Sequence, residues 1–367
     1  LTGALLAFGP QLTAWAERDF RQATPPAPAA ALSVDALLAA AQTANPAGRP
    51  TAVTFRPEPA ATVVVNFGRE NGSVYLNPFT GAVVGHTTSL QKTLQQVEQW
   101  HRWLGSRTMG KPVADAANLL FCFLAISGLY LWWPRRWNWA ALRPIVWFAG
   151  GLRGRARDWN WHNVIGLWSA PVLVVLTLSG VIMSYSWANH LLFKLAGSPP
   201  PPVRTEGEGP ANSPRETTPV QGERKSREPR DSVGNVAESH RVSLDLVRAT
   251  VAAEFPHWQS LTLRLPTRPG GPVICSVVEP AGWNPTPRAS ITLDSATGNI
   301  LKCERYADQS LGRRWRTWVR ILHTGEAGRW PGQLVAALAS LGGCVLVWTG
   351  LALAWRRFGQ WKAKLNS

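Results

Sequence analysis

Two segments of this 367-residue chain, residues 101–133 and 323–355, repeat one pattern at a constant offset of 222. Each begins with a histidine, His101 or His323, and runs through an apolar stretch to a Ser-Gly or Thr-Gly pair 27 residues later. Internal repetition constrains a fold strongly because each copy must form the same supersecondary unit. Two histidines held at one distance from equivalent helices are therefore predicted to meet at one shared object.

The repetition extends beyond these helices. Residues 1–3 (Leu-Thr-Gly) align with residues 178–180 (Leu-Ser-Gly) at an offset of 177, and residues 33–37 align with residues 243–247 at an offset of 210. The offset grows because of one insertion, residues 198–232, whose Pro, Arg, Glu and Ser content predicts a disordered linker. Each half therefore reads as helix, small αβ domain, histidine, helix.

Three segments without charged residues, 116–133, 163–185 and 334–355, are long enough to cross a bilayer, which takes about 20 apolar residues. The chain opens inside an apolar stretch that aligns with the end of the second of these segments. We therefore expect residues 1–16 to be the end of a further spanning helix that begins upstream of Leu1. The predicted fold class is a mixed membrane protein, a four-helix transmembrane bundle with two small α+β domains and an internal duplication.

Basic residues set the expected topology. They cluster after the segment 116–133 and at the C-terminus, and by the positive-inside rule both places are cytoplasmic. The small domains must then lie outside. Much of the formal net charge of +16 is explained by this solvated cytoplasmic rim, which anionic lipid also attracts, and is not taken as a sign of nucleic-acid binding. The clusters are Arg135, Arg136, Arg143, Arg153, Arg155 and Arg157, then Arg356, Arg357, Lys362 and Lys364.

Each small domain is expected to hold one helix followed by antiparallel strands and a hairpin loop, residues 77–81 in the first copy and 294–298 in the second. Units of about 60 residues are marginal alone, so we expect them to pack on each other and on the membrane end. The predicted order is the end of helix one (1–16), outer domain one (17–100), histidine segment and helix two (101–134), basic cytoplasmic loop (135–161), helix three (162–187), linker (198–232), outer domain two (240–310), histidine segment and helix four (320–356) and cytoplasmic tail (357–367).

These motifs resemble a known family. The helix-and-hairpin units that close in Asn-Pro-Phe-Thr-Gly and Asp-Ser-Ala-Thr-Gly are similar to PepSY domains. Residues 128–136, 161–168 and 323–326 resemble the PepSY-associated transmembrane helix family, often called iron-regulated membrane proteins. The resemblance implies a multi-pass protein of the bacterial inner membrane with two periplasmic PepSY domains. Some relatives are haem-containing ferric-siderophore reductases, and others carry a flavin reductase module that this chain lacks.

Three histidines are the candidate haem ligands. His101 and His323 lie on the expected outer side, and His162 lies at the cytoplasmic start of helix three. Two layers of histidine fit a transmembrane electron path through two b-type haems, because haem iron accepts an axial imidazole on each face. The duplication places the partner of His162 upstream of Leu1. His190 is the reserve outer ligand. The alternative is that these histidines only sit among interfacial Trp and Arg side chains; His86, His240 and His257 are assigned to domain surfaces.

Other chemical signals are fewer. Trp103, Trp132 and Trp168 are candidates to flank a porphyrin, and Cys122 and Cys344 are expected to be packing residues. Whether Cys275 and Cys303 form a disulfide is left open. The sequence contains no CxxCH haem-attachment motif, no dinucleotide-binding fingerprint and no Walker loop.

The sequence therefore predicts an inner-membrane b-type haem protein, a haem-dependent reductase that passes electrons to a periplasmic acceptor. The acceptor is expected to be a ferric chelate such as a siderophore, and the donor is quinol or a cytoplasmic reductase. The alternative is a non-redox membrane module whose PepSY domains bind or regulate a periplasmic partner such as a peptidase. A permease is disfavoured because the spanning segments carry no interior charge.

Overall fold

A computed structural model describes residues 1–24, 30–134, 137–200, 242–268, 270–279 and 287–365. The predicted linker 198–232 lies almost wholly outside these residues, and so do Arg135, Arg136 and His240. The chain divides into two compact units. The helical unit holds Leu1–Ala14, Ser89–Pro202 and Ser310–Ser367, and the sheet unit holds Trp15–Thr88 and Val203–Gln309. The helix that carries His101 thus belongs to the helical unit.

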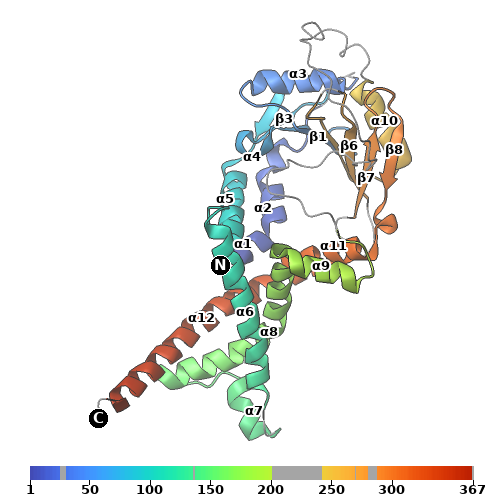
Figure 1. The fold of residues 1–367 in the computed structure, drawn as a ribbon. Coiled ribbons are helices and arrows are strands. Elements are labelled where there is room, and N and C mark those ends of the chain that lie inside the picture. The colour runs from blue at the N-terminus through green and yellow to red at the C-terminus, as the bar shows by residue number, and fades with distance from the viewer. Residues whose placement is uncertain (25–29, 135–136, 201–241, 269, 280–286, 366–367) are drawn as a thin grey trace, which may run out of the picture. The chain divides into compact units, whose positions relative to one another are not determined.

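Three helices of the helical unit are long and apolar enough to cross a membrane: Gly110–Trp132, Gly154–Ser184 and the segment Glu326–Lys362. They contain α6 (Gly110–Trp132), α8 (Gly154–Ser184) and α12 (Arg329–Leu365). Helix α8 packs against both α6 and α12 (Figure 1). It approaches α12 closely at Gly342, where a Cβ atom would lie 2.3 Å from Ser169 Oγ. Small residues at such crossings let helices in membranes pack backbone to backbone.

The shorter helices of this unit repeat at the offsets read from the sequence. Helix α5 (Ser89–Trp103) corresponds to α11 (Leu311–Thr324), and both end before a short break that precedes a spanning helix. Helix α1 (Thr2–Ala7) is followed at once by α2 (Gly9–Ala16), just as α8 is followed by α9 (Ser186–Leu195). The remaining short elements are α7 (Trp139–Val146) and η3 (Glu326–Gly328).

The sheet unit contains one antiparallel sheet of eight strands in the order β4-β3-β2-β1-β5-β6-β7-β8. Strand β1 of the first repeat pairs with β5 of the second, with Val53 opposite Leu263 and Thr54 opposite Thr262. The expectation that the two small domains pack on each other was therefore right. The sequence did not predict that they share one sheet. This pairing is favourable because joining two edge strands removes two rows of unpaired backbone groups. The strands are β1 (Ala52–Phe55), β2 (Val63–Asn66), β3 (Ser73–Leu76), β4 (Val83–His86), β5 (Ser260–Arg264), β6 (Val273–Val278), β7 (Arg288–Leu293) and β8 (Ile300–Glu304).

One hydrophobic core lies between the sheet and two helices, α3 (Val34–Ala44) and α10 (Leu244–Glu254) (Figure 1). Strands β5 and β6 alternate buried and less buried side chains, as expected when one face of a sheet is covered. Ser33 caps α3 as predicted, because its Oγ accepts from the amide of Ala36 at 3.2 Å. The turn glycines Gly81 and Gly298 take positive φ, 70° and 74°, which confirms the predicted hairpin loops.

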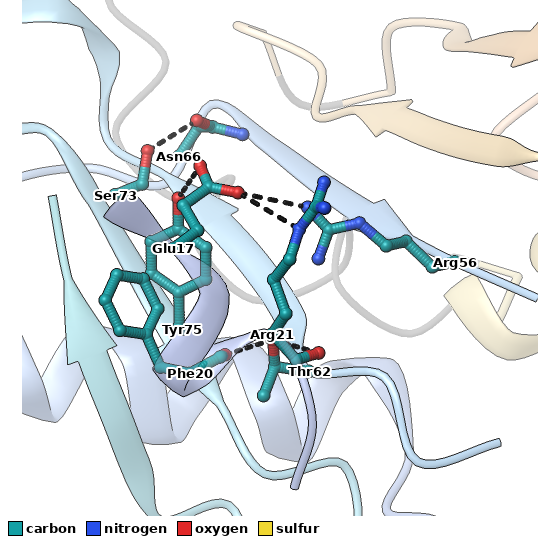
Figure 2. Close-up of polar contacts among 8 residues, drawn as sticks. All are labelled: Glu17, Phe20, Arg21, Arg56, Thr62, Asn66, Ser73 and Tyr75. Atoms are coloured by element: carbon teal, nitrogen blue, oxygen red, sulfur yellow. Dashed lines mark hydrogen bonds and ion pairs between the residues drawn. The ribbon is translucent and has the colours of Figure 1, made fainter. Parts of the chain in front are cut away.

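A buried acid ties the start of the sheet unit to the sheet. Figure 2 shows Glu17, beside η1 (Arg18–Phe20), among side chains from two strands and the adjoining loop. Its Oε1 accepts from the hydroxyl of Tyr75 at 2.6 Å, and its Oε2 lies 3.6 Å from Arg21 Nε and 3.5 Å from Arg56 Nη2. A carboxylate with several charged and hydroxyl donors offsets the cost of leaving water. Short elements α4 (Gly68–Asn71) and η2 (Tyr306–Asp308) complete this unit.

The geometry of the sheet excludes a disulfide between Cys275 and Cys303. Both residues lie directly opposite Ile291, Cys275 from β6 and Cys303 from β8, so strand β7 separates them. Two strand spacings amount to about 10 Å, whereas bridged cysteines have Cα atoms within about 7 Å. Both thiols are free, and the question left open by the sequence is answered for this fold.

Candidate functional site

The two outer histidines face each other inside the helical unit. His101 lies near the end of α5 and His323 near the end of α11, and their ring centroids are 6.2 Å apart with planes tilted by 45°. The two helices are equivalent in the repeat, so each presents its histidine from the same turn. Residues 222 positions apart in the chain thus meet, as the repeat predicts.

Each of these rings is bonded through Nδ1 to a hydroxyl from another helix of its own repeat. His101 Nδ1 lies 3.1 Å from Thr2 Oγ1, and His323 Nδ1 lies 3.0 Å from Ser179 Oγ. His323 Nδ1 also lies 2.9 Å from the carbonyl oxygen of Leu176. Since Thr2 and Ser179 are equivalent at the offset of 177, the two bonds are copies of one arrangement.

The surroundings of His323 favour a neutral ring. Burial lowers the pKa of His323, and the hydrogen bond to the Leu176 carbonyl opposes this only in part. A carbonyl oxygen can only accept, so Nδ1 carries the hydrogen and Nε2 keeps its lone pair. Neutral imidazole with one free nitrogen is the form that binds a metal.

The separation of the two rings fits a shared iron. Two Fe–N bonds of about 2 Å each, with each ring centre set about 1 Å behind its nitrogen, place the centroids about 6 Å apart. The observed 6.2 Å matches that requirement. The chain's donor set, two neutral imidazoles, is also the set found in b-type haem proteins.

His162 occupies a separate place on the first third of α8. Its Nδ1 lies 2.9 Å from Thr349 Oγ1 on α12. One turn earlier, Asp158 is 97 % buried and bonds Arg356 on α12 at 3.0 Å, with Arg157 at 2.9 Å. Two successive contacts between α8 and α12, one ionic and one through imidazole, therefore fix the direction of the His162 side chain.

A cavity of about 550 Å³ lies beside His162. Its walls come from α6, α8 and α12 and are mainly apolar, with Ser127, Gly128 and Trp132 on α6 facing it. The indole Nε1 of Trp132 is buried and has no hydrogen-bond partner among the described residues. Of the described residues that line this cavity, His162 is the one histidine. Cavities of this size and character are typical of cofactor sites.

The other sequence candidates lie elsewhere. His190 is on α9 and does not share in either histidine arrangement, and His86 and His257 are exposed in the sheet unit. Trp103 is stacked by Arg102 and Arg107, whereas Trp168 donates to the carbonyl of Val146 at 3.1 Å. Of the three tryptophans proposed to flank a porphyrin, Trp132 is the one that lines the cavity of His162.

Sequence reasoning missed the hydroxyl partners. The Ser-Gly and Thr-Gly pairs served only to align the repeats, and no role was given to their hydroxyls. The sequence did carry a signal for these partners, because a Ser-Gly or Thr-Gly pair stands at equivalent places in four apolar segments, at residues 2–3, 127–128, 179–180 and 349–350. Within the described ranges, no group of three or more His, Cys, Asp or Glu side chains could hold a metal ion by itself.

Two comparisons with known proteins bear on this arrangement. The family described as "PepSY-associated TM region" matches residues 1–357, which is nearly the whole chain. No curated protein matches it.

Proposed function

We propose that this chain, which belongs to the family of the PepSY-associated TM region, is a membrane haem protein that passes electrons across the bilayer. The proposal rests on one observation: His101 and His323 come from equivalent helices, face each other at 6.2 Å and are both held through Nδ1. A b-type haem supplies a one-electron carrier whose iron alternates between the ferric and ferrous states.

The chain's own residues would hold and orient two such groups. His101 and His323 would be the axial ligands of an outer haem, with Nε2 of each ring toward the iron. His162 would be a ligand of an inner haem in the cavity beside it, with Trp132 available to donate to an acceptor there. The apolar cavity wall excludes water, which raises the strength of local electrostatic interactions and sets the potential.

The charge distribution supports one orientation of this electron path across the membrane. Basic residues after α6 and in the last turns of α12 support a cytoplasmic location of the His162 end, by the positive-inside rule. In this proposal the spanning helices lie in the inner membrane and the sheet unit lies in the periplasm. We propose quinol or a cytoplasmic reductase as donor, and a ferric chelate such as a siderophore as periplasmic acceptor. Each electron delivered would convert one Fe³⁺ of the chelate to Fe²⁺.

A spectrum of the purified full-length protein tests this function. We expect a b-type haemochrome and about two haems per chain, with oxidation of the dithionite-reduced protein on addition of a ferric chelate. A colourless protein that gains no spectrum when haem is added would contradict the proposal. It would instead favour the non-redox reading, in which the sheet unit binds or regulates a periplasmic partner.

A further inference from the structure

Four serine-glycine or threonine-glycine pairs lie at equivalent places in the apolar segments of the helical unit, and three of their hydroxyls bond a histidine. Thr2 bonds His101, Ser179 bonds His323 and Thr349 bonds His162, always at Nδ1 and at 2.9–3.1 Å. The fourth hydroxyl, of Ser127, faces the cavity of His162 and donates to its own helix at the Leu124 carbonyl, 3.2 Å away. The hydroxyl–imidazole bond occurs both at the outer histidine pair and at His162, and the hydroxyls are related by the repeat offsets of 177 and 222. This recurrence indicates a functional arrangement rather than accidental packing.

The direction of these hydrogen bonds follows from what each hydroxyl does with its single hydrogen. Thr349 Oγ1 donates to the carbonyl of Val345 at 2.8 Å, and Ser179 Oγ donates to that of Leu176 at 2.8 Å. With the hydrogen used inside its own helix, each oxygen can only accept from the imidazole. Nδ1 of His162 and of His323 therefore carries a hydrogen, and Nε2 is the free nitrogen.

Two of the glycines that follow these hydroxyls, Gly3 and Gly350, lie beside a histidine ring. A Cβ atom at Gly350 would lie 3.4 Å from Cε1 of His162, and one at Gly3 would lie 3.5 Å from Cε1 of His101. An added methyl group would therefore be in ordinary van der Waals contact with each ring, and the hydroxyl is the group that bonds the ring and selects its tautomer.

We propose that Thr2, Ser179 and Thr349 are positioning residues that orient the histidine ligands and tune the potential of the bound iron. The inference rests on the proposed function, and it adds the residues that set the ligand geometry. A hydrogen bond accepted from Nδ1–H makes imidazole a stronger donor and favours ferric over ferrous iron. Removing the hydroxyl therefore weakens haem binding and raises the midpoint potential.

Paired variants separate this role from simple packing. Thr349→Val keeps the shape and removes the hydroxyl, whereas Thr349→Ser keeps the hydroxyl; Ser179→Ala and Ser179→Thr form the second pair. Matched controls are Thr177→Val on α8 and Ser340→Ala on α12, because those hydroxyls donate to their own helix at Leu173 and Ala336 and bond no imidazole.

The readouts are haem dissociation, redox potentiometry and low-temperature electron paramagnetic resonance of the full-length holoprotein. Thr349→Val should weaken haem binding at its site about 10- to 100-fold. Ser179→Ala should weaken binding at the other site by less, because the Leu176 carbonyl still accepts from His323 Nδ1. A tenfold preferential loss of ferric binding corresponds to a rise of about 59 mV in that site's potential. The ferric signal, which reports the mutual angle of the ligand rings, should broaden. Thr349→Ser, Ser179→Thr and both controls should stay within about twofold of the parent.

The outcomes separate this inference from the function beneath it. If the parent binds haem and Thr349→Val and Ser179→Ala change neither affinity, potential nor signal, the positioning role is wrong while the haem assignment stands. If the parent binds no haem, the proposed function is wrong. The ¹⁵N resonance of histidine Nδ1 in the haem-free chain then still reports the hydrogen bond. An unchanged resonance in both hydroxyl-free variants would overturn the positioning role.

Discussion

The imidazole rings of His101 and His323 lie 6.2 Å apart between centroids, although 222 residues separate them in the sequence. Their helices, α5 and α11, are equivalent elements of a duplicated chain and bring the rings together from opposite repeats. The site is therefore pseudo-symmetric, and each half supplies one ligand and one hydroxyl. Loss of either half should disable the same site.

The first prediction concerns this outer pair. Replacement of His101 or His323 by Ala should remove about half the haem of the full-length protein, because a b-type haem needs both axial imidazoles for stable binding. The pyridine haemochrome assay measures the remaining stoichiometry. His190→Ala is the control, since it changes a nearby half-buried histidine that takes no part in the pair. Full haem content in both single variants would rule out the axial assignment.

The second prediction concerns His162. His162→Ala should retain the outer haem and lose the inner one, so reduction by quinol or by a cytoplasmic donor should stop while dithionite still reduces the outer site. Stopped-flow absorbance of the protein in vesicles measures both rates. Thr177→Val is a suitable control on the same helix, because Thr177 donates to its own helix at Leu173 and is not among the described residues that line the cavity. Transmembrane reduction at an unchanged rate in His162→Ala would contradict a two-layer path.

The sequence was sufficient for the three long apolar helices and for the hairpins of the sheet unit, because their signals are local. Apolar length identified α6, α8 and α12, and the Ser33 cap and Gly81 turn marked the limits of regular structure in the sheet unit. The repeat supplied the long-range contact between His101 and His323. A fixed offset carries spatial information that periodicity within one segment does not.

The features that the sequence did not predict depend on pairing across the chain. The β1–β5 seam joins two repeats edge to edge, and no local pattern distinguishes that edge from a solvent-exposed one. The hydroxyl of Thr349 bonds His162 only because α8 and α12 cross there, and the Asp158–Arg356 pair fixes the same crossing. Such contacts depend on helix rotation, which an all-round apolar segment leaves undetermined.

The third prediction concerns the cysteines of the sheet unit. Cys303 is exposed, whereas Cys275 is fully buried and burial raises the pKa of its thiol to about 12 from 9.0. A maleimide should label Cys303 in the native protein near neutral pH and label Cys275 only after unfolding, as peptide mass spectrometry can show. Above pH 9 the unfolded chain loses the Cys275 thiol proton while the folded protein retains it. The free energy of unfolding should therefore fall as pH rises above 9. Equal labelling rates in the native protein would contradict the buried placement of Cys275.

The fourth prediction concerns the acid cluster of Figure 2. Tyr75→Phe removes the hydroxyl that donates to Glu17 Oε1 at 2.6 Å, at a site where the carboxylate is largely buried. Hydrogen bonds to charged groups contribute about 1.5–3 kcal/mol, so the free energy of unfolding of the sheet unit should fall by about that amount. Denaturant titration of the full chain measures it. Tyr130→Phe, at an exposed position, should be neutral, and an equally neutral Tyr75→Phe would mean that the bond does not stabilise the fold.

The fifth prediction concerns the seam between the repeats. Thr54 on β1 and Thr262 on β5 lie directly opposite each other, with their hydroxyl oxygens 3.1 Å apart. Directly opposed residues have Cβ atoms about 4.5–5.5 Å apart, close to the span of a disulfide. In a Cys303→Ser background, mild oxidation of Thr54→Cys/Thr262→Cys should therefore yield a linked peptide that mass spectrometry detects.

The control for this cross-link is a pair of positions that lie one strand further apart in the same sheet. Ser276 on β6 is paired with Thr262, so Thr54 and Ser276 lie two strands apart, about 10 Å. Thr54→Cys/Ser276→Cys should stay reduced under conditions that link the first pair. A continuous sheet requires the first double variant to link and the second not to. If neither links, or both link at similar rates, then β1 and β5 are not held in register and the two repeats do not share one sheet.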